Sequence, residues 1–189
     1  GGAETNGVAL LNYDVNSSDV ATTNKDYIRG SFGILSNGPT NLTSHQIKIF
    51  DKTEDNVGVM PLDNVLLNIG GGSIELDGGT TSKNNIGIYI GPKPATPPAP
   101  TPTTGQGTVK STGDIKVNGG VGNLAIFAVG GTVAAGETNN VEVREVKATD
   151  TKNSVLIYGS TGAKVKLSDG TGLPTGTTYG LNISGATVE

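Results

Sequence analysis

The chain has 189 residues, of which 30 are glycine, 9 are proline, 5 are tyrosine, 3 are phenylalanine and 16% are charged, a composition that suits short strands and turns better than long helices. The formal net charge of -4, with no basic cluster, excludes the electrostatic footprint of a nucleic-acid-binding protein or a polybasic membrane surface. Cysteine is absent, which excludes disulfides and thiolate metal sites, and neither a long apolar run nor a charged leader predicts a membrane span or signal peptide.

A five-residue motif recurs along the chain as a turn residue, an apolar residue, a small residue, an apolar residue and a large residue. The seven copies are Gly7–Leu11, Ser31–Leu35, Asn56–Met60, Asn85–Tyr89, Asn123–Phe127, Ser154–Tyr158 and Thr178–Asn182. Their fourth positions are separated by 24, 25, 29, 38, 31 and 24 residues. Because one coil of a parallel β-helix has this size, we predict an all-β, right-handed parallel β-helix (solenoid) of about seven coils. The glycine-rich turns also suit hairpins, so an antiparallel β-sandwich or barrel is the alternative.

The one long interval contains a proline-rich tract at residues 92–104, which holds six of the nine prolines. Without these 13 residues the interval is 25, close to the others. Since proline cannot donate to a strand ladder, we predict a single segment over residues 1–189, with the tract as a loop inserted in one coil. The alternative is a linker between residues 1–91 and 105–189.

A second motif, apolar–charged–apolar, lies between copies of the first. The alternation predicts that the charged residue faces solvent while the aliphatic residues face inward, so each coil has at least two strands. Neighbouring strands of a parallel stack lie about 4.8 Å apart, so unlike charges at this position would stabilise one another. In chain order the charged residues are Lys48, Glu75, Lys116, Glu142 and Lys166.

Two tracts carry a family resemblance: NNIGIY at residues 84–89, and NSVLIYGS at residues 153–160 followed by GAKVKL at residues 162–167. They resemble repeats of the large fusobacterial autotransporter adhesins of the RadD-like group, and the resemblance spans most of the chain. It implies a passenger segment at the bacterial cell surface, secreted or anchored through an outer-membrane barrel that is not in this sequence. Its partners would be a host-cell receptor or glycan, or the surface of another bacterium. The shared motif is a scaffold motif, so no binding residue carries over.

Candidate catalytic groups are few. His45, the only histidine, is predicted to be an ordinary turn residue. The acidic residues considered for a catalytic or metal site are Asp51, Glu54, Asp55, Asp63 and Asp77. They are predicted to lie on solvated corners, and they would have to converge in a groove for the alternative function, a polysaccharide-binding or polysaccharide-cleaving β-helix of the tailspike or lyase type. We therefore predict a non-enzymatic adhesin segment with no catalytic residue, metal or cofactor.

The large fifth position of the first motif defines a second column, whose members are Leu11, Leu35, Met60, Tyr89, Phe127, Tyr158 and Asn182. Strict alternation places this column outside, whereas a strand that ends at a corner would turn it into the core. In the outward case, Tyr89, Phe127 and Tyr158 would form an aromatic strip able to stack on sugars or on a protein partner. Loops on rigid scaffolds often carry recognition, so the other candidate contact residues are Pro97, Pro98 and Pro100.

Overall fold

The computed structural model describes residues 10–15, 28–29, 32–50, 53–92, 105–149, 155–169, 171–172 and 179–189. Within these ranges the secondary structure consists of strands, and every pair of neighbouring strands is parallel. The prediction of an all-β chain with parallel sheets is confirmed. The antiparallel alternative is wrong.

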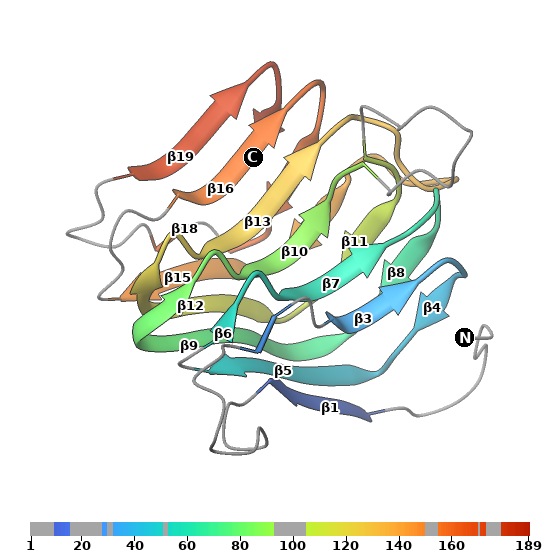
Figure 1. The fold of residues 1–189 in the computed structure, drawn as a ribbon. Coiled ribbons are helices and arrows are strands. Elements are labelled where there is room, and N and C mark those ends of the chain that lie inside the picture. The colour runs from blue at the N-terminus through green and yellow to red at the C-terminus, as the bar shows by residue number, and fades with distance from the viewer. Residues whose placement is uncertain are drawn as a thin grey trace, which may run out of the picture.

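The strands form three sheets, which we name A, B and C (Figure 1). Sheet A follows the path β1 (Leu10–Val15), β5 (Ser44–Phe50), β9 (Gly71–Lys83), β12 (Asp114–Val121), β15 (Glu145–Thr149) and β18 (Thr171–Gly172), with β2 (Ile28–Arg29) and β6 (Thr53–Glu54) beside it. Sheet B contains β3 (Phe32–Ser36), β7 (Val57–Pro61), β10 (Ile86–Ile90), β13 (Leu124–Val129), β16 (Val155–Ser160) and β19 (Tyr179–Ser184). Sheet C contains β4 (Thr40–Asn41), β8 (Leu66–Asn68), β11 (Thr108–Lys110), β14 (Val141–Val143), β17 (Lys164–Leu167) and β20 (Thr187–Val188).

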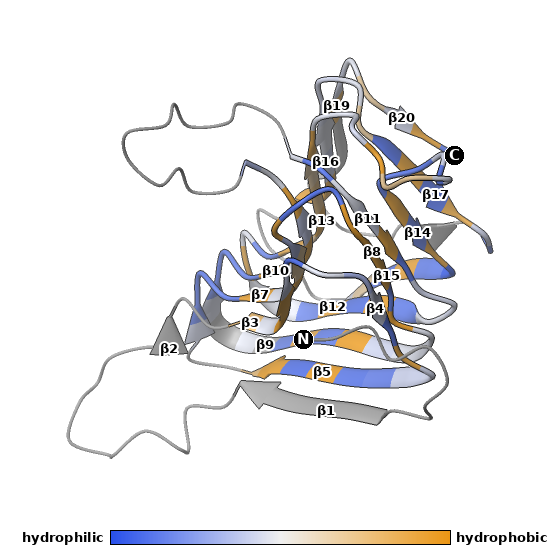
Figure 2. Cartoon of the chain, turned by 90° about the vertical axis from the view of Figure 1, so that its right-hand side faces the viewer, coloured by the Kyte–Doolittle hydropathy of each residue, from blue (hydrophilic) through white to orange (hydrophobic). Residues whose placement is uncertain are grey.

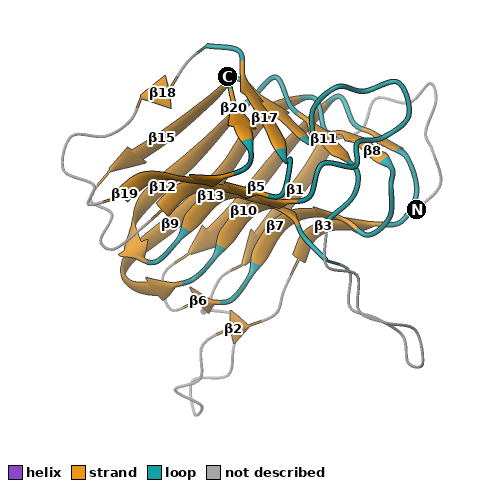
Figure 3. Ribbon diagram, turned by 90° about the horizontal axis from the view of Figure 1, so that it is seen from above, coloured by secondary structure: helices purple, strands orange, loops and turns teal. Residues whose placement is uncertain are grey.

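From β3 onward the chain visits the sheets in the order B, C and A, and each circuit adds one main strand to each sheet. Figure 2 shows the three sheets facing one another around a common interior, and Figure 3 shows from above how the strands of successive circuits lie side by side. A strand therefore pairs with strands one circuit earlier and later along the chain. Copies of the five-residue motif recur at intervals of about one circuit for this reason.

The first copy of the five-residue motif does not belong with the others. Leu10–Val15 is β1, and its Leu10 pairs with Ser44 of β5 in sheet A, whereas the later copies supply the strands of sheet B. Residues 7–9 lie outside the described ranges. Within the described part, sheet B therefore has six strands rather than seven.

Strands from both sides of the proline-rich tract pair with one another. Strand β10 precedes the tract and pairs with β13 beyond it in sheet B. Strands β11 and β12 follow the tract and pair with β8 and β9, which precede it, in sheets C and A. The two sides thus share all three sheets and one aliphatic core.

The core is built from aliphatic side chains at alternating strand positions. In sheet A, Ile47 and Ile49 are buried while Lys48 between them is only half-buried, and Figure 2 shows the same alternation of hydropathy along β9 and β12. Isoleucine and valine suit this pleated, half-buried environment because their branched Cβ packs well against neighbouring strands. The fully buried large side chains include Ile47, Leu67, Ile74, Leu76, Ile88, Ile90, Ile115, Ile126, Leu156 and Ile157.

Buried asparagines stack at the turn that leads into sheet B. Asn56, Asn85 and Asn123 immediately precede β7, β10 and β13, and each is fully buried. The Oδ1 of Asn85 accepts hydrogen bonds from the backbone N–H and the side-chain amide of Asn56, both at 3.0 Å. The Oδ1 of Asn123 accepts one from the backbone N–H of Asn85 at 2.9 Å. The side chains of Asn85 and Asn123 therefore each satisfy a buried backbone N–H of the preceding circuit.

Three of the predicted charge neighbours meet on sheet A. Lys48 pairs in register with Glu75, and Glu75 with Lys116. The Lys48 Nζ lies 3.5 Å and the Lys116 Nζ 3.0 Å from the Glu75 carboxylate. Burial acts to raise the pKa of Glu75, but hydrogen bonds from Lys116 and Ser73 and the two lysine charges lower it overall. The predicted alternation of charge is therefore present across these three strands.

The predicted alternation is wrong between Lys116 and Glu142, whereas Glu142 and Lys166 are neighbours of opposite charge as predicted. The neighbour of Lys116 on the next strand of sheet A is Lys147, whose Nζ lies 2.9 Å from a carboxylate oxygen of Glu145. Glu142 and Lys166 pair with each other in sheet C instead. Strands β14 and β17 of sheet C show the same apolar–charged–apolar alternation as sheet A, so the pattern alone does not separate the two sheets.

Replacing Glu75 with lysine should destabilise the fold. Glu75→Lys converts two attractive neighbours on adjacent strands into repulsive ones, so we expect the free energy of unfolding to fall by about 1–2 kcal/mol. The matched control is Glu137→Lys in the loop before β14, which reverses one ion pair but leaves Lys110 its second partner, Glu142, at 3.6 Å. Urea titration compares the two variants. Equal losses would contradict the register of β5, β9 and β12.

Candidate functional site

Tyr89, Phe127 and Tyr158 form a stacked column on the outer face of sheet B. They occupy equivalent positions of β10, β13 and β16 and are paired in register. The ring centroids are 5.0 Å apart at both steps, with interplanar angles of 6° and 9°. All three side chains are half-buried and lie outside the aliphatic core cluster, whereas Ile88 and Ile90, which flank Tyr89, are fully buried within it. The column therefore projects outward.

The stacking determines which parts of the aromatic rings are accessible. Both faces of Phe127 are covered, one by Tyr89 and the other by Tyr158, because the strand spacing holds the rings almost parallel. A sugar cannot lie flat against Phe127, as the predicted strip suggested. The column instead presents ring edges. Burial raises the pKa of the Tyr89 hydroxyl, so this side chain is uncharged at neutral pH.

The rest of the fifth-position column differs in exposure. Leu35 is 45% exposed and pairs with Met60, which is only 5% exposed.

The Tyr89 ring lies against the backbone of Gly91, which follows β10. A Cβ added to Gly91 would come within 2.1 Å of the Tyr89 Cζ. The aromatic column thus adjoins the start of the proline-rich tract at Pro92. The predicted contact residues Pro97, Pro98 and Pro100, and the side chain of Asn182, lie outside what the structure describes.

His45 is a buried residue of strand β5 rather than the predicted turn residue. It is 2% exposed, and its Nδ1 lies 2.9 Å from the carbonyl oxygen of Ile69 on the neighbouring circuit. Burial lowers the pKa of His45, outweighing its backbone hydrogen bonds, so the imidazole is neutral at pH 7. The neutral imidazole of His45 is therefore packed in the interior of the fold.

The acidic residues lie on separate parts of the surface. Glu54 and Asp55 lie where the chain passes from sheet A to sheet B, Asp63 lies between β7 and β8, and Asp77 is an exposed residue of β9. Asp51 lies outside the described ranges. Among the described residues, no group of three or more histidine, aspartate or glutamate side chains is arranged to hold a metal ion.

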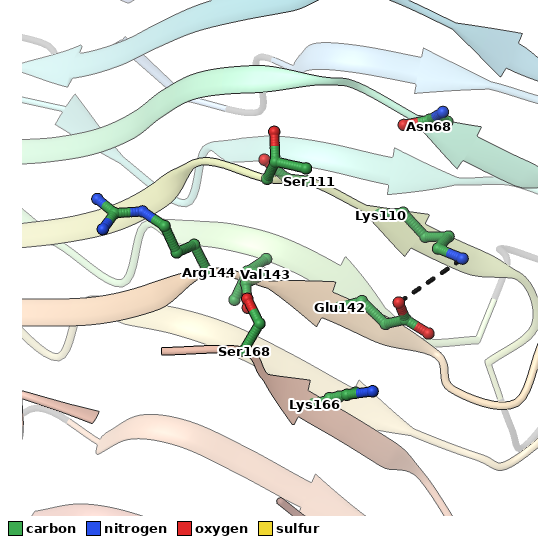
Figure 4. A pocket seen from close by; sticks show the side chains of 9 residues that line it. Asn68, Lys110, Ser111, Glu142, Val143, Arg144, Lys166 and Ser168 are labelled. Carbon is green, nitrogen blue, oxygen red and sulfur yellow. Dashed lines mark hydrogen bonds and ion pairs between the residues drawn. The ribbon is translucent and has the colours of Figure 1, made fainter. Parts of the chain in front are cut away.

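A groove of about 470 Å³, lined mostly by residues with polar or charged groups, runs across four circuits where sheet C turns toward sheet A (Figure 4). Its walls come from the ends of β8, β11, β14 and β17 and the residues that follow each strand. The lining residues are Asn68, Lys110, Ser111, Thr112, Glu142, Val143, Arg144, Lys166 and Ser168. Reasoning from sequence missed this groove, because its residues follow the short strands of a sheet that the motifs did not separate from sheet A.

Arg144, one of the lining residues, is tied to a buried carboxylate. Asp114 begins β12, and its side chain is only 9% exposed. Its Oδ2 accepts a hydrogen bond from Arg144 and lies 3.7 Å from the Lys147 Nζ. Arg144 also donates to Asp169 at 3.2 Å. These two carboxylates fix the guanidinium at the edge of the groove.

Comparison with known proteins adds no relative. No protein-family model, curated protein or solved structure matches the chain. Within the described part, no helix of the length and hydropathy needed to cross a membrane is present.

Proposed function

We propose that the chain is a segment of the passenger domain of a bacterial surface adhesin of the autotransporter type, folded as a right-handed parallel β-helix. The three parallel sheets, visited in a fixed order, support this fold, and the right-handed sense follows the usual preference of parallel strand connections. The sequence resemblance to fusobacterial passenger repeats supports the class of protein. Such a segment would lie on the cell surface, anchored or secreted.

The observation that carries the proposal is the outward aromatic column on a rigid, repeating scaffold. Tyr89, Phe127 and Tyr158 are held in register by the strand ladder, so they form a preorganised surface with little side-chain entropy to lose on contact. Their edges and the tyrosine hydroxyls suit a protein or glycan on a host cell or on a partner bacterium. No cofactor takes part in this function.

Attachment is favoured over polysaccharide cleavage by the placement of the carboxylates. A β-helix that hydrolyses a polysaccharide needs two carboxyl groups that flank one bond. Asp55, Asp63 and Asp77 come instead from different corners and faces. The aromatic column, by contrast, gathers three side chains on one accessible face.

Binding of the labelled chain to host cells and to other bacteria, measured by flow cytometry, tests the proposal. The double variant Tyr89→Phe with Tyr158→Phe keeps the stack but removes both hydroxyls, and we expect it to bind more weakly than the natural chain. The control Gln46→Ala alters an exposed residue on sheet A and should leave binding unchanged. Absence of saturable binding would refute the adhesin proposal. Equal binding by the double variant would show that the hydroxyls of the column are not the contact.

A further inference from the structure

We propose that the groove on sheet C binds an anionic glycan, a linear polysaccharide bearing carboxylate or sulfate groups. This site is separate from the aromatic column, which lies on sheet B. Its assignment rests on the shape, charge and backbone pairing of the groove, and not on the proposed adhesin function.

The shape of the groove fits an extended chain. It crosses four successive strands of sheet C, because Asn68, Lys110, Glu142 and Lys166 are register neighbours on β8, β11, β14 and β17. At about 4.8 Å for each step between strands, the three steps give a length of roughly 14 Å. The side chains recur at this step, which suits a ligand that is itself a repeating chain.

The charge of the groove selects an anion. Three of its lining residues are cations, Lys110, Arg144 and Lys166, against one carboxylate, Glu142. Carboxylates just outside the lining, Glu137, Asp114 and Asp169, form ion pairs with Lys110 and Arg144. The positive charge that these pairs leave uncompensated is therefore that of Lys166.

The three cations are not equally available. Lys110 lies 2.9 Å from Glu137 and 3.6 Å from Glu142, and the hydrogen bond to Glu137 raises the pKa of Lys110. Arg144 is held by two aspartates. Lys166 is exposed and makes no ion pair with any other described residue, although it faces the end of the same groove in Figure 4. Lys166 is thus the cation free to take an anionic group, with Arg144 and Lys110 fixed beside it.

The backbone and the remaining side chains favour a glycan over an acidic peptide. An extended peptide would gain affinity by pairing with a strand edge, but β8, β11, β14 and β17 are each paired on both sides within sheet C. The uncharged polar lining residues are Asn68, Ser111, Thr112 and Ser168. Their hydroxyl and amide groups match the hydroxyl-rich surface of a sugar chain. Val143 is the one lining residue with an aliphatic side chain, and it is buried.

Lys164 supplies a matched control for Lys166. Both lysines lie on β17, both are exposed, and both point away from the core, since Val165 between them is buried. Lys166 lines the groove, whereas Lys164 does not. Lys166→Gln and Lys164→Gln therefore remove the same charge from the same strand, and neither change touches the core.

Isothermal titration calorimetry with the whole chain decides the question, using heparin as a sulfated probe, polygalacturonate as a carboxylated probe, dextran as a neutral one and polyglutamate as an acidic peptide. We expect heparin or polygalacturonate to bind, with affinity falling as salt is added, and dextran not to bind. The glycan that binds identifies the anionic group. Lys166→Gln should raise the Kd about tenfold, the loss expected for one charge-assisted hydrogen bond. Lys164→Gln should change it by less than about twofold, because a charge outside the groove acts only through screened attraction.

Three results would overturn the proposal. If neither anionic glycan binds the natural chain, the groove is not a glycan site. Equal losses of affinity in Lys166→Gln and Lys164→Gln would show that the glycan is attracted by the overall charge of this face rather than bound in the groove. Polyglutamate binding as tightly as the glycans would show that the ligand class is wrong.

Discussion

Asn85→Ala should lower the free energy of unfolding by about 3 kcal/mol. The substitution removes the oxygen that accepts the buried backbone N–H of Asn56 and the donor that reaches Thr53 and Asn123. A buried polar group left without its partner retains the full cost of its desolvation, and the lost amide also leaves a cavity between the circuits. Urea denaturation followed by circular dichroism measures the loss.

An exposed asparagine pair provides the control for this experiment. Asn68 donates its side-chain amide to Asn41 of the preceding circuit at 3.1 Å, but this bond is on the surface. Water replaces the lost partner there, so Asn68→Ala should cost less than about 1 kcal/mol. A similar loss for the two variants would mean that the buried asparagine stack contributes no more than a surface contact.

Gly72→Ala should destabilise the chain by about 3–5 kcal/mol, through backbone strain and overlap together. Gly72 has φ of 118°, a conformation that residues with a Cβ rarely adopt. A Cβ at this position would lie 1.8 Å from the carbonyl oxygen of His45 on the neighbouring strand of sheet A. That atom belongs to the backbone ladder, so it cannot move aside without breaking the pairing of β5 with β9.

Comparison with Gly136→Ala separates the effect of backbone strain from that of steric overlap. Gly136 also has a positive φ, 84°, but a Cβ there would meet no atom within 4 Å. Only the conformational strain should remain, about 1 kcal/mol. Thermal unfolding of both variants measures the difference. Should Gly136→Ala prove as damaging as Gly72→Ala, close approach of neighbouring circuits would not be what requires glycine at position 72.

Strand content and interior-facing positions could be predicted from the sequence, because both depend on local patterns. The alternation around Lys48, Glu75 and Lys116 identified the outward face of sheet A and two correct pairs of neighbours. Sheet C could not be recognised in the same way. Its strands have two to four residues, and a segment such as Val141–Val143 reads like a strand of sheet A. Which sheet it joins is decided by the path of the chain between strands.

The candidate sites could likewise be predicted only in part from the sequence. Tyr89, Phe127 and Tyr158 share one motif position, so their alignment was visible in the sequence, but the covered faces of Phe127 follow from the ring geometry. The asparagines before β7, β10 and β13 were visible only as turn residues, because burial cannot be inferred from a turn pattern. The groove joins Lys110, Arg144 and Lys166, which share no single motif, and only the register of sheet C brings them together.

The pairing of each strand with the circuit before and after it has a consequence for how the molecule comes apart. Energetic coupling in such a one-dimensional array passes only between nearest neighbours, so a weakened circuit acts as a breakpoint that divides the array into two blocks. The circuit of Asn85 lies near the middle of sheet B, with β3 and β7 on one side and β13, β16 and β19 on the other. Damage there would uncouple the two ends, whereas the same damage in β19 would only fray the terminus.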